Sequence, residues 1–102
     1  SLLTVLSQAE GGIDLLEEIR NKCNTDPFLK RIADAPQDFK NFEIEDGLIY
    51  IRENGSKLLC IPQIIVQGRS AREIVISEAH SLLAHLGVTK TLAYLRAQVW
   101  WK

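Results

Sequence analysis

Two histidines, His80 and His85, are the residues of this sequence best suited to binding a metal ion. Neutral imidazole is a common metal ligand, and a structural zinc site takes four protein ligands in a tetrahedron. Five positions along a helix turn the chain by about 500°, or about 140° from alignment, so the two rings converge only if the helix ends between them. No further histidine, cysteine or side-chain carboxylate follows His85. These residues are therefore either half of a metal site or histidines of the surface and packing.

The last segment of the chain also suggests contacts with nucleic acid. Phosphate contacts would come from Lys90, Arg96 and Lys102. Stacking on bases would come from the aromatic residues of the same segment, Tyr94, Trp100 and Trp101. The alternative is that Tyr94 and one tryptophan fill a core.

The charge distribution favours a basic end to the molecule only mildly. Residues 69–102 hold 5 Lys+Arg and 2 Asp+Glu, a net charge of +3, whereas residues 1–68 hold 7 Lys+Arg and 11 Asp+Glu, a net charge of −4. Such an asymmetry is typical of a nucleic-acid-facing surface at one end, although ordinary surface scatter also produces it.

The composition and the motifs of the sequence exclude several other classes of protein. A hydrophobic content of 46% and a charged content of 25% in 102 residues are those of one small globular protein. No apolar run is long enough to cross a membrane, so we expect no membrane partner. We find no phosphate-binding glycine loop and no nucleophile motif, and therefore expect no enzymatic activity from this stretch. Cys23 and Cys60 have neither metal-like nor redox-like spacing, which favours reduced thiols.

The histidines must be positioned by two helices joined by a turn at Gly87. Ser70 and Glu73 have the spacing of a capping box, so we expect the first helix to start there, with Leu86 among its inward residues. Thr89 is the expected N-cap of a second helix over residues 90–99. Its inward residues would be Leu92, Leu95 and Val99.

The preceding residues predict a small scaffold, and the fold class as a whole is α+β. Residues 13–23 have helical spacing, and Asp26 followed by Pro27 predicts the start of a second helix over residues 27–34. Residues 42–62 predict a three-stranded antiparallel meander, turning at Asp46-Gly47 and Asn54-Gly55, with the N-terminal helices packed on one face. Residues 63–69 form a connector, and residues 1–8 are either a strand or a helical turn. We expect two units, residues 1–68 and residues 69–102.

The motifs of the second unit, in order REIV, EAH, HLG, KTL and VWW between Arg72 and Trp101, form a set. This set resembles the amino-terminal His-His-Cys-Cys zinc-binding domain of integrases from gypsy-type long-terminal-repeat retrotransposons. The segment NTDPF at residues 24–28 and the hairpin of residues 46–62 are similar to the stretch that joins the ribonuclease H region to that domain in the polyprotein.

The resemblance implies that His80 and His85 are zinc ligands, with a Cys-x-x-Cys pair further downstream as the other two. The sequence stops at Lys102 without that pair, so we expect a truncated domain with half a zinc site and weak or no zinc binding. We also expect Trp100, Trp101 and the apolar faces of the C-terminal helices to be uncovered and to favour self-association.

The function implied is that of a non-catalytic module of an integrase, which supports integration of element cDNA. Its partners would be DNA ends and other integrase subunits in a homo-oligomer, and it would act in the nucleus after assembly in the cytoplasm. The alternative is a domesticated or integrase-like module that binds a protein partner and no DNA.

Overall fold

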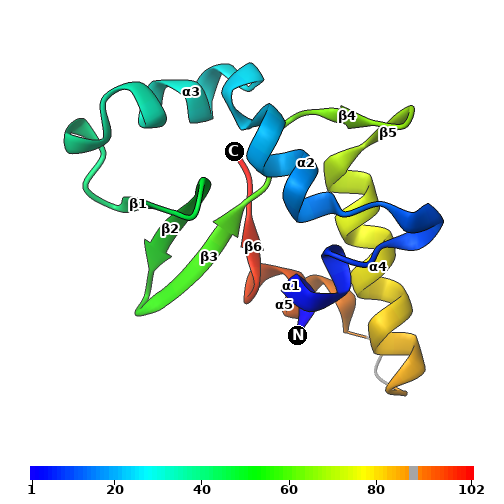
Figure 1. Ribbon diagram of the computed structural model, residues 1–102. Coiled ribbons are helices and arrows are strands. Elements are labelled where there is room, and N and C mark those ends of the chain that lie inside the picture. Colours follow the sequence, from blue (N-terminus) through cyan, green and yellow to red (C-terminus); the bar gives the residue numbers. More distant parts are fainter. Residues whose placement is uncertain (88–89) are drawn as a thin grey trace.

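The computed structural model describes residues 1–87 and 90–102 (Figure 1). Three helices precede the strands: α1 (Leu2–Leu6), α2 (Leu15–Lys22) and α3 (Pro27–Asp34). The strands that follow are β1 (Phe42–Glu45), β2 (Leu48–Glu53), β3 (Ser56–Cys60), β4 (Ile65–Val66) and β5 (Arg69–Ser70). The chain then forms α4 (Ala71–His85), α5 (Thr91–Arg96) and β6 (Val99–Trp100). The predicted α+β class, with a meander after N-terminal helices, is confirmed.

The meander is antiparallel, with β1 paired to β2 and β2 paired to β3. Its two turns are those predicted from sequence, because Asp46, Gly47, Asn54 and Gly55 all have positive φ angles. Positive φ at both central residues is what a tight two-residue hairpin requires, and Asn, Asp and Gly reach it at the lowest cost.

A fourth strand, β6, pairs in parallel with β3 and completes the sheet order β1-β2-β3-β6. The prediction of one helix over residues 90–99 is therefore wrong at its end, because α5 stops at Arg96. The helix ends early because the following residues pair with β3 as a strand. The Leu59 amide donates to the Gln98 carbonyl at 3.3 Å, and the Ile61 amide donates to the Trp100 carbonyl at 2.9 Å. In Figure 1, β6 runs through the middle of the molecule.

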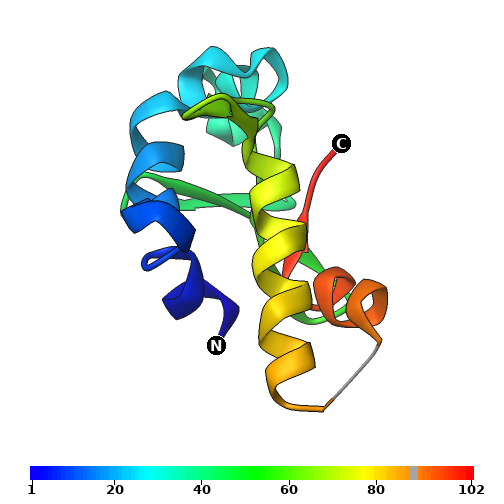
Figure 2. The same ribbon diagram turned by 90° about the vertical axis from the view of Figure 1, so that its right-hand side faces the viewer.

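The sheet separates two hydrophobic cores, because successive side chains of a strand point to opposite faces. On one face, residues such as Leu48 and Leu59 pack with α1, α2 and α4. On the other face, Ile49, Ile51 and Leu58 pack with α3. Figure 2 shows α4 upright, with α1 and α2 on one side of it and α5 on the other. The N-terminal helices thus cover the meander as predicted, but on both of its faces.

Two of the helices near the N-terminus begin directly after an aspartate that caps them. Asp14 caps α2 by accepting a hydrogen bond from the Glu17 amide. Asp26 caps α3 by accepting from the Phe28 and Leu29 amides, and Pro27 occupies the first turn, as predicted. Residues 1–8, which the sequence left between strand and helix, contain α1.

Two details near α4 differ from expectation. The connector of residues 63–69 contains the β4–β5 hairpin, whose turn places Gln67 and Gly68 at positive φ. The capping box is wrong as a hydrogen-bonded motif, since the Ser70 side chain makes no cap bond and the Glu73 carboxylate lies 3.9 Å from Arg69 Nε. The helix does start where predicted, since Ser70 is the N-cap residue of α4, and Ser70 also ends β5, paired with Ile65.

Near the end of α4 and the start of α5, two leucines do not face inward as predicted. Gly87 follows α4 with φ of 75°, as a residue after a helix C-cap often does. Leu86 and Leu92, predicted to face inward, are 63% and 60% exposed, whereas Leu95 and Val99 are buried. Thr89, predicted as an N-cap, lies outside the described residues. Among the described residues, none of the helices is long and apolar enough to cross a membrane.

Candidate functional site

The two predicted zinc ligands lie on α4 and are both exposed. His80 approaches α5, with its Nδ1 atom 3.4 Å from Oγ1 of Thr91. His85 is the last residue of α4. Because α4 continues through His85, the two side chains leave the helix about 140° apart. The structure therefore does not bring the two imidazoles together.

The residues present do not fit a tetrahedral zinc site as they are placed. Within residues 1–87 and 90–102, no group of three or more His, Cys, Asp or Glu side chains is arranged to hold a metal ion. A structural zinc site requires four such ligands converging on one point. The assignment of His80 and His85 as a half-site stays a prediction, and we derive no zinc-dependent step.

The two cysteines lie elsewhere, in the core between the sheet and α3. Burial, followed by the nearby Asp26 carboxylate, raises the pKa of the Cys23 thiol to about 11. Burial, followed by Cys23 and Asp26, raises the pKa of the Cys60 thiol to about 12. Because the thiolate is the form that binds metals, protonated and buried thiols at neutral pH are packing residues in this fold.

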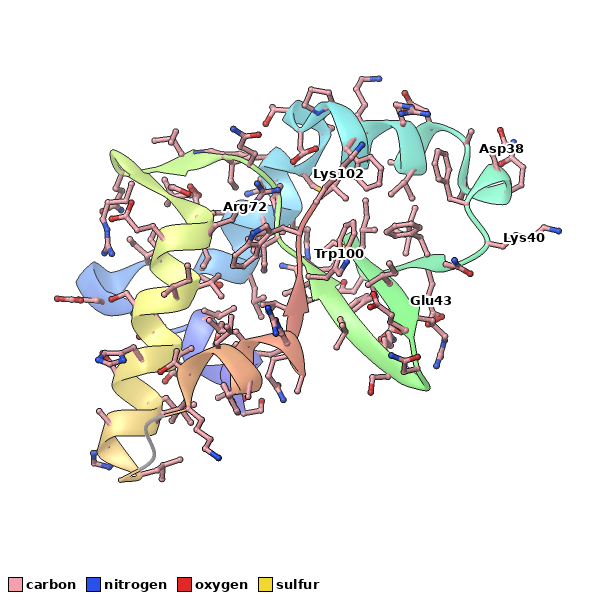
Figure 3. All side chains as sticks on the ribbon, turned by 180° about the vertical axis from the view of Figure 1, so that it is seen from behind. Asp38, Lys40, Glu43, Arg72, Trp100 and Lys102 are labelled. Atoms are coloured by element: carbon pink, nitrogen blue, oxygen red, sulfur yellow. The ribbon has the colours of Figure 1, made fainter. Side chains whose placement is uncertain are left out.

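The predicted phosphate-binding residues fall at two places. Lys90 precedes α5 and Arg96 ends it, and both side chains are exposed. Lys102 is also exposed, but its Nζ atom lies over the Phe28 ring of α3 at 4.6 Å from the centroid. Figure 3 shows Lys102 beside α3, away from α5. The structure thus places Lys90 and Arg96 at the two ends of α5 and separates Lys102 from them.

The aromatic residues of the same segment are packed. The Trp100 ring lies 5.8 Å from that of Phe42 and 6.0 Å from that of Phe28. Tyr94 and Trp101 pack against the other core. All three are half-buried, so the expectation that both tryptophans are uncovered is wrong: β6 places Trp100 and Val99 on opposite faces of the sheet.

Arg72, which the sequence analysis did not single out, lies with Trp100 and Lys102 around a hollow of about 270 Å³ (Figure 3). Its guanidinium donates from Nε to the Ile61 carbonyl at 3.2 Å and lies 3.9 Å from the buried Asp26 carboxylate. Asp26 already accepts bonds from three backbone amides. Arg72 and Asp26 carry opposite charges in this hollow, and their contacts connect α4 to α3 and the end of β3.

A second hollow, of about 490 Å³, lies between α4 and the α5–β6 segment. We call it the α4–α5 groove, and the residues that define it are Ile76, Thr91, Leu92, Leu95, Arg96, Val99 and Trp101. Its apolar rim is open to solvent, since Ile76 is 43% exposed and Leu92 is 60% exposed. The spacing of the apolar residues of α5 was the one sequence feature that could have indicated this groove, but it predicted that Leu92 lies in the core.

Comparison with known families gives one match. Residues 68–102 match the family model described as the integrase zinc binding domain. This match confirms the resemblance predicted for the C-terminal part of the chain, whereas the resemblance of the preceding residues to an integrase polyprotein stays a prediction. No curated protein and no solved structure matches the chain.

Proposed function

We propose that residues 69–102 are the helical part of an integrase amino-terminal domain and that residues 1–68 are an extension that holds it. The match of residues 68–102 to the integrase zinc binding domain carries this proposal. The extension supports α4 through the shared core, where Leu2, Leu15 and Leu59 pack with Ile74 and Val75. The module is non-catalytic and serves assembly and DNA contact. Its parent would be a gypsy-type retrotransposon polyprotein whose integrase acts in the nucleus after assembly in the cytoplasm.

In this proposal the DNA-facing surface is α5, through Lys90 and Arg96. Both side chains are exposed, and neither forms an ion pair within the described residues. Free cations of this kind neutralise phosphates and release counterions, which makes binding sensitive to salt. Lys102 would add a contact from the other side of β6, and its role is separable by substitution. Stacking of bases is not part of the proposal, because the aromatic rings are committed to the two cores.

His80 and His85 would both bind the zinc of the complete domain only if α4 ended between them, because on the continuous α4 of this fold they lie about 140° apart. The family match supports zinc as the cofactor of the whole domain. Contact with other integrase subunits is likewise proposed from the family.

The salt dependence of duplex DNA binding tests the proposal. We expect the double variant Lys90→Gln/Arg96→Gln to bind more weakly than the wild type and to lower the slope of log K against log salt by about 2, since each phosphate contact contributes about 0.9. Lys102→Gln should lower it by about 1 if Lys102 contacts a phosphate. Fluorescence anisotropy of a labelled duplex measures both quantities.

Lys40→Gln is the matched control, because Lys40 is also exposed but lies between α3 and β1 in the acidic part of the chain. A slope that falls equally in this control, or that is unchanged in the double variant, contradicts a DNA surface on α5. Absence of DNA binding by the wild type would favour the alternative of a module that binds only protein.

A further inference from the structure

The α4–α5 groove is an apolar surface that the proposed DNA contact does not use. Its walls come from Ile76 on one side and Leu92 and Leu95 on the other, with Val99 and Trp101 at the end nearest the sheet. Contiguous exposed apolar surface with a polar rim is typical of protein interaction sites. DNA phosphates are charged and do not bind an apolar surface, so we expect a different partner to bind in the groove.

The groove exists because α5 is short and turns only part of its apolar surface inward. Leu95 is 7% exposed and lies in the main core, whereas Leu92, one turn earlier, remains 60% exposed. Across the groove Ile76 is 43% exposed, although Val75 next to it on α4 is fully buried. These two exposed side chains are anchored on regular helices that a core holds in place, so a partner meets a preformed site.

The charges around the groove are positive. Arg96 lines it, Lys90 directly precedes it, and the Arg72 guanidinium lies 5.7 Å from the centre of the Trp101 ring. None of the residues that line the groove, all of them in the described part of the chain, carries a carboxylate.

Each of the two carboxylates of α4 has a contact within the chain. Glu78 accepts a hydrogen bond from the Glu10 amide at 2.7 Å, next to α1, and Glu73 lies 3.9 Å from Arg69. Arg96 and Lys90, which form no ion pair within the described residues, are therefore available to a negatively charged partner. Arg72, by contrast, already contacts Asp26 and the Ile61 carbonyl.

We infer that the α4–α5 groove binds an acidic amphipathic helix of a partner protein. The length of α5, six residues or about 9 Å, matches two turns of such a helix, whose apolar side chains at i, i+3 or i+4, and i+7 would enter between Ile76 and Leu92. Acidic side chains beside them would face Arg96 and Lys90. A second copy of this chain is a poorer occupant, because a two-fold contact brings the same positive rim against itself.

Three synthetic peptides test this inference. The first is a labelled 16-residue helix with Leu at the i, i+3, i+4 and i+7 positions and Glu on the flanks. The second replaces every Glu by Lys, and the third scrambles the first. We expect fluorescence anisotropy to detect binding of the acidic helix at least about tenfold tighter than binding of the other two, since like charge and a broken apolar stripe each remove complementarity.

Substitutions in the chain locate the site. Leu92→Gln and Ile76→Gln should each weaken binding of the acidic peptide about tenfold or more, while Ile65→Gln leaves it unchanged. Ile65 is the matched control, because it is 62% exposed and lies on β4, outside the groove. Circular dichroism and thermal unfolding of the three variants should match the wild type, which separates lost binding from lost folding.

Several outcomes would overturn the inference. They are equal binding of the acidic and basic peptides, no binding of the acidic peptide, unchanged binding in both groove variants, or a wild-type dimer that Leu92→Gln dissociates in sedimentation. DNA binding by Leu92→Gln and Ile76→Gln should equal that of the wild type, so the groove and the proposed DNA surface can fail independently. Arg96 belongs to both surfaces, and its variants are therefore not used to separate them.

Discussion

Leu59→Ala is expected to lower the free energy of unfolding by about 3 kcal/mol. Leu59 is 1% exposed and lies on β3 between Tyr50 of β2 and Val99 of β6. Truncation of a buried leucine costs its transfer free energy plus that of the cavity, in a range of about 2–5 kcal/mol. Leu59 belongs to the same core as Ile74 of α4, so the loss should appear in one unfolding transition that includes both halves of the chain. Urea unfolding followed by circular dichroism measures it.

Leu92→Ala is the matched control, because the same atoms are removed from a side chain that is 60% exposed. Its free energy of unfolding should remain within about 0.5 kcal/mol of the wild type, as for most surface substitutions. Equal losses in the two variants would contradict the placement of β3 at the centre of the fold and of Leu92 at the rim of the groove. Two separate transitions in the wild type would contradict the shared core.

Asp26→Ala is expected to cost about 2–4 kcal/mol. Asp26 is 5% exposed. One of its carboxylate oxygens accepts from the Phe28 and Leu29 amides, and the other accepts from the Gln63 amide at 2.7 Å. Loss of a helix cap alone costs about 1 kcal/mol. The substitution also leaves the Gln63 amide without its acceptor, and an unpaired buried polar group adds about 1–3 kcal/mol. The Arg72 guanidinium loses a carboxylate 3.9 Å away but keeps its hydrogen bond to the Ile61 carbonyl.

Asp14→Ala separates the two contributions, since Asp14 caps α2 through one hydrogen bond to the Glu17 amide and is exposed. Its loss should be about 1 kcal/mol, the value of a cap alone. Chemical unfolding of both variants gives the comparison. A loss in Asp26→Ala no larger than that in Asp14→Ala would show that Asp26 does not connect α3 to the end of the sheet.

The parts of the fold that sequence predicted are those with local causes. The Asp26-Pro27 pair specifies the start of α3, and the two turn pairs specify the meander, because each requires only the residues within a few positions. Gly87 likewise ends α4 through its own positive φ. None of these features depends on distant partners.

The parts that sequence did not predict depend on pairing across the chain. Val99 continues the helical spacing of Leu92 and Leu95, so periodicity extended the helix through it. The competing state, a strand beside β3, is stabilised by backbone groups of Leu59 and Ile61, about forty residues earlier. The same non-local pairing places Trp100 against Phe28 and Phe42. Short strands such as β4 have too few residues for a pattern.

The candidate site was predicted less completely than the fold. The family pattern identified His80 and His85, yet their separation along one continuous helix places them on different faces. Lys90 and Arg96 are exposed in the structure, and their contact with phosphate stays a prediction. Arg72 and Ile76 were missed because their roles arise from what lies opposite them.

The most direct test of the proposed function is a titration of the protein with duplex DNA, observed through the arginine side-chain Nε–Hε signals in an NMR spectrum. The proposal predicts that the Arg96 signal shifts with added duplex and that salt reverses the shift. Arg52, which lies 3.0 Å from Glu43 on the meander, serves as the internal reference and should not move. An unchanged Arg96 signal, or equal shifts at Arg96 and Arg52, would contradict a DNA-binding surface on α5.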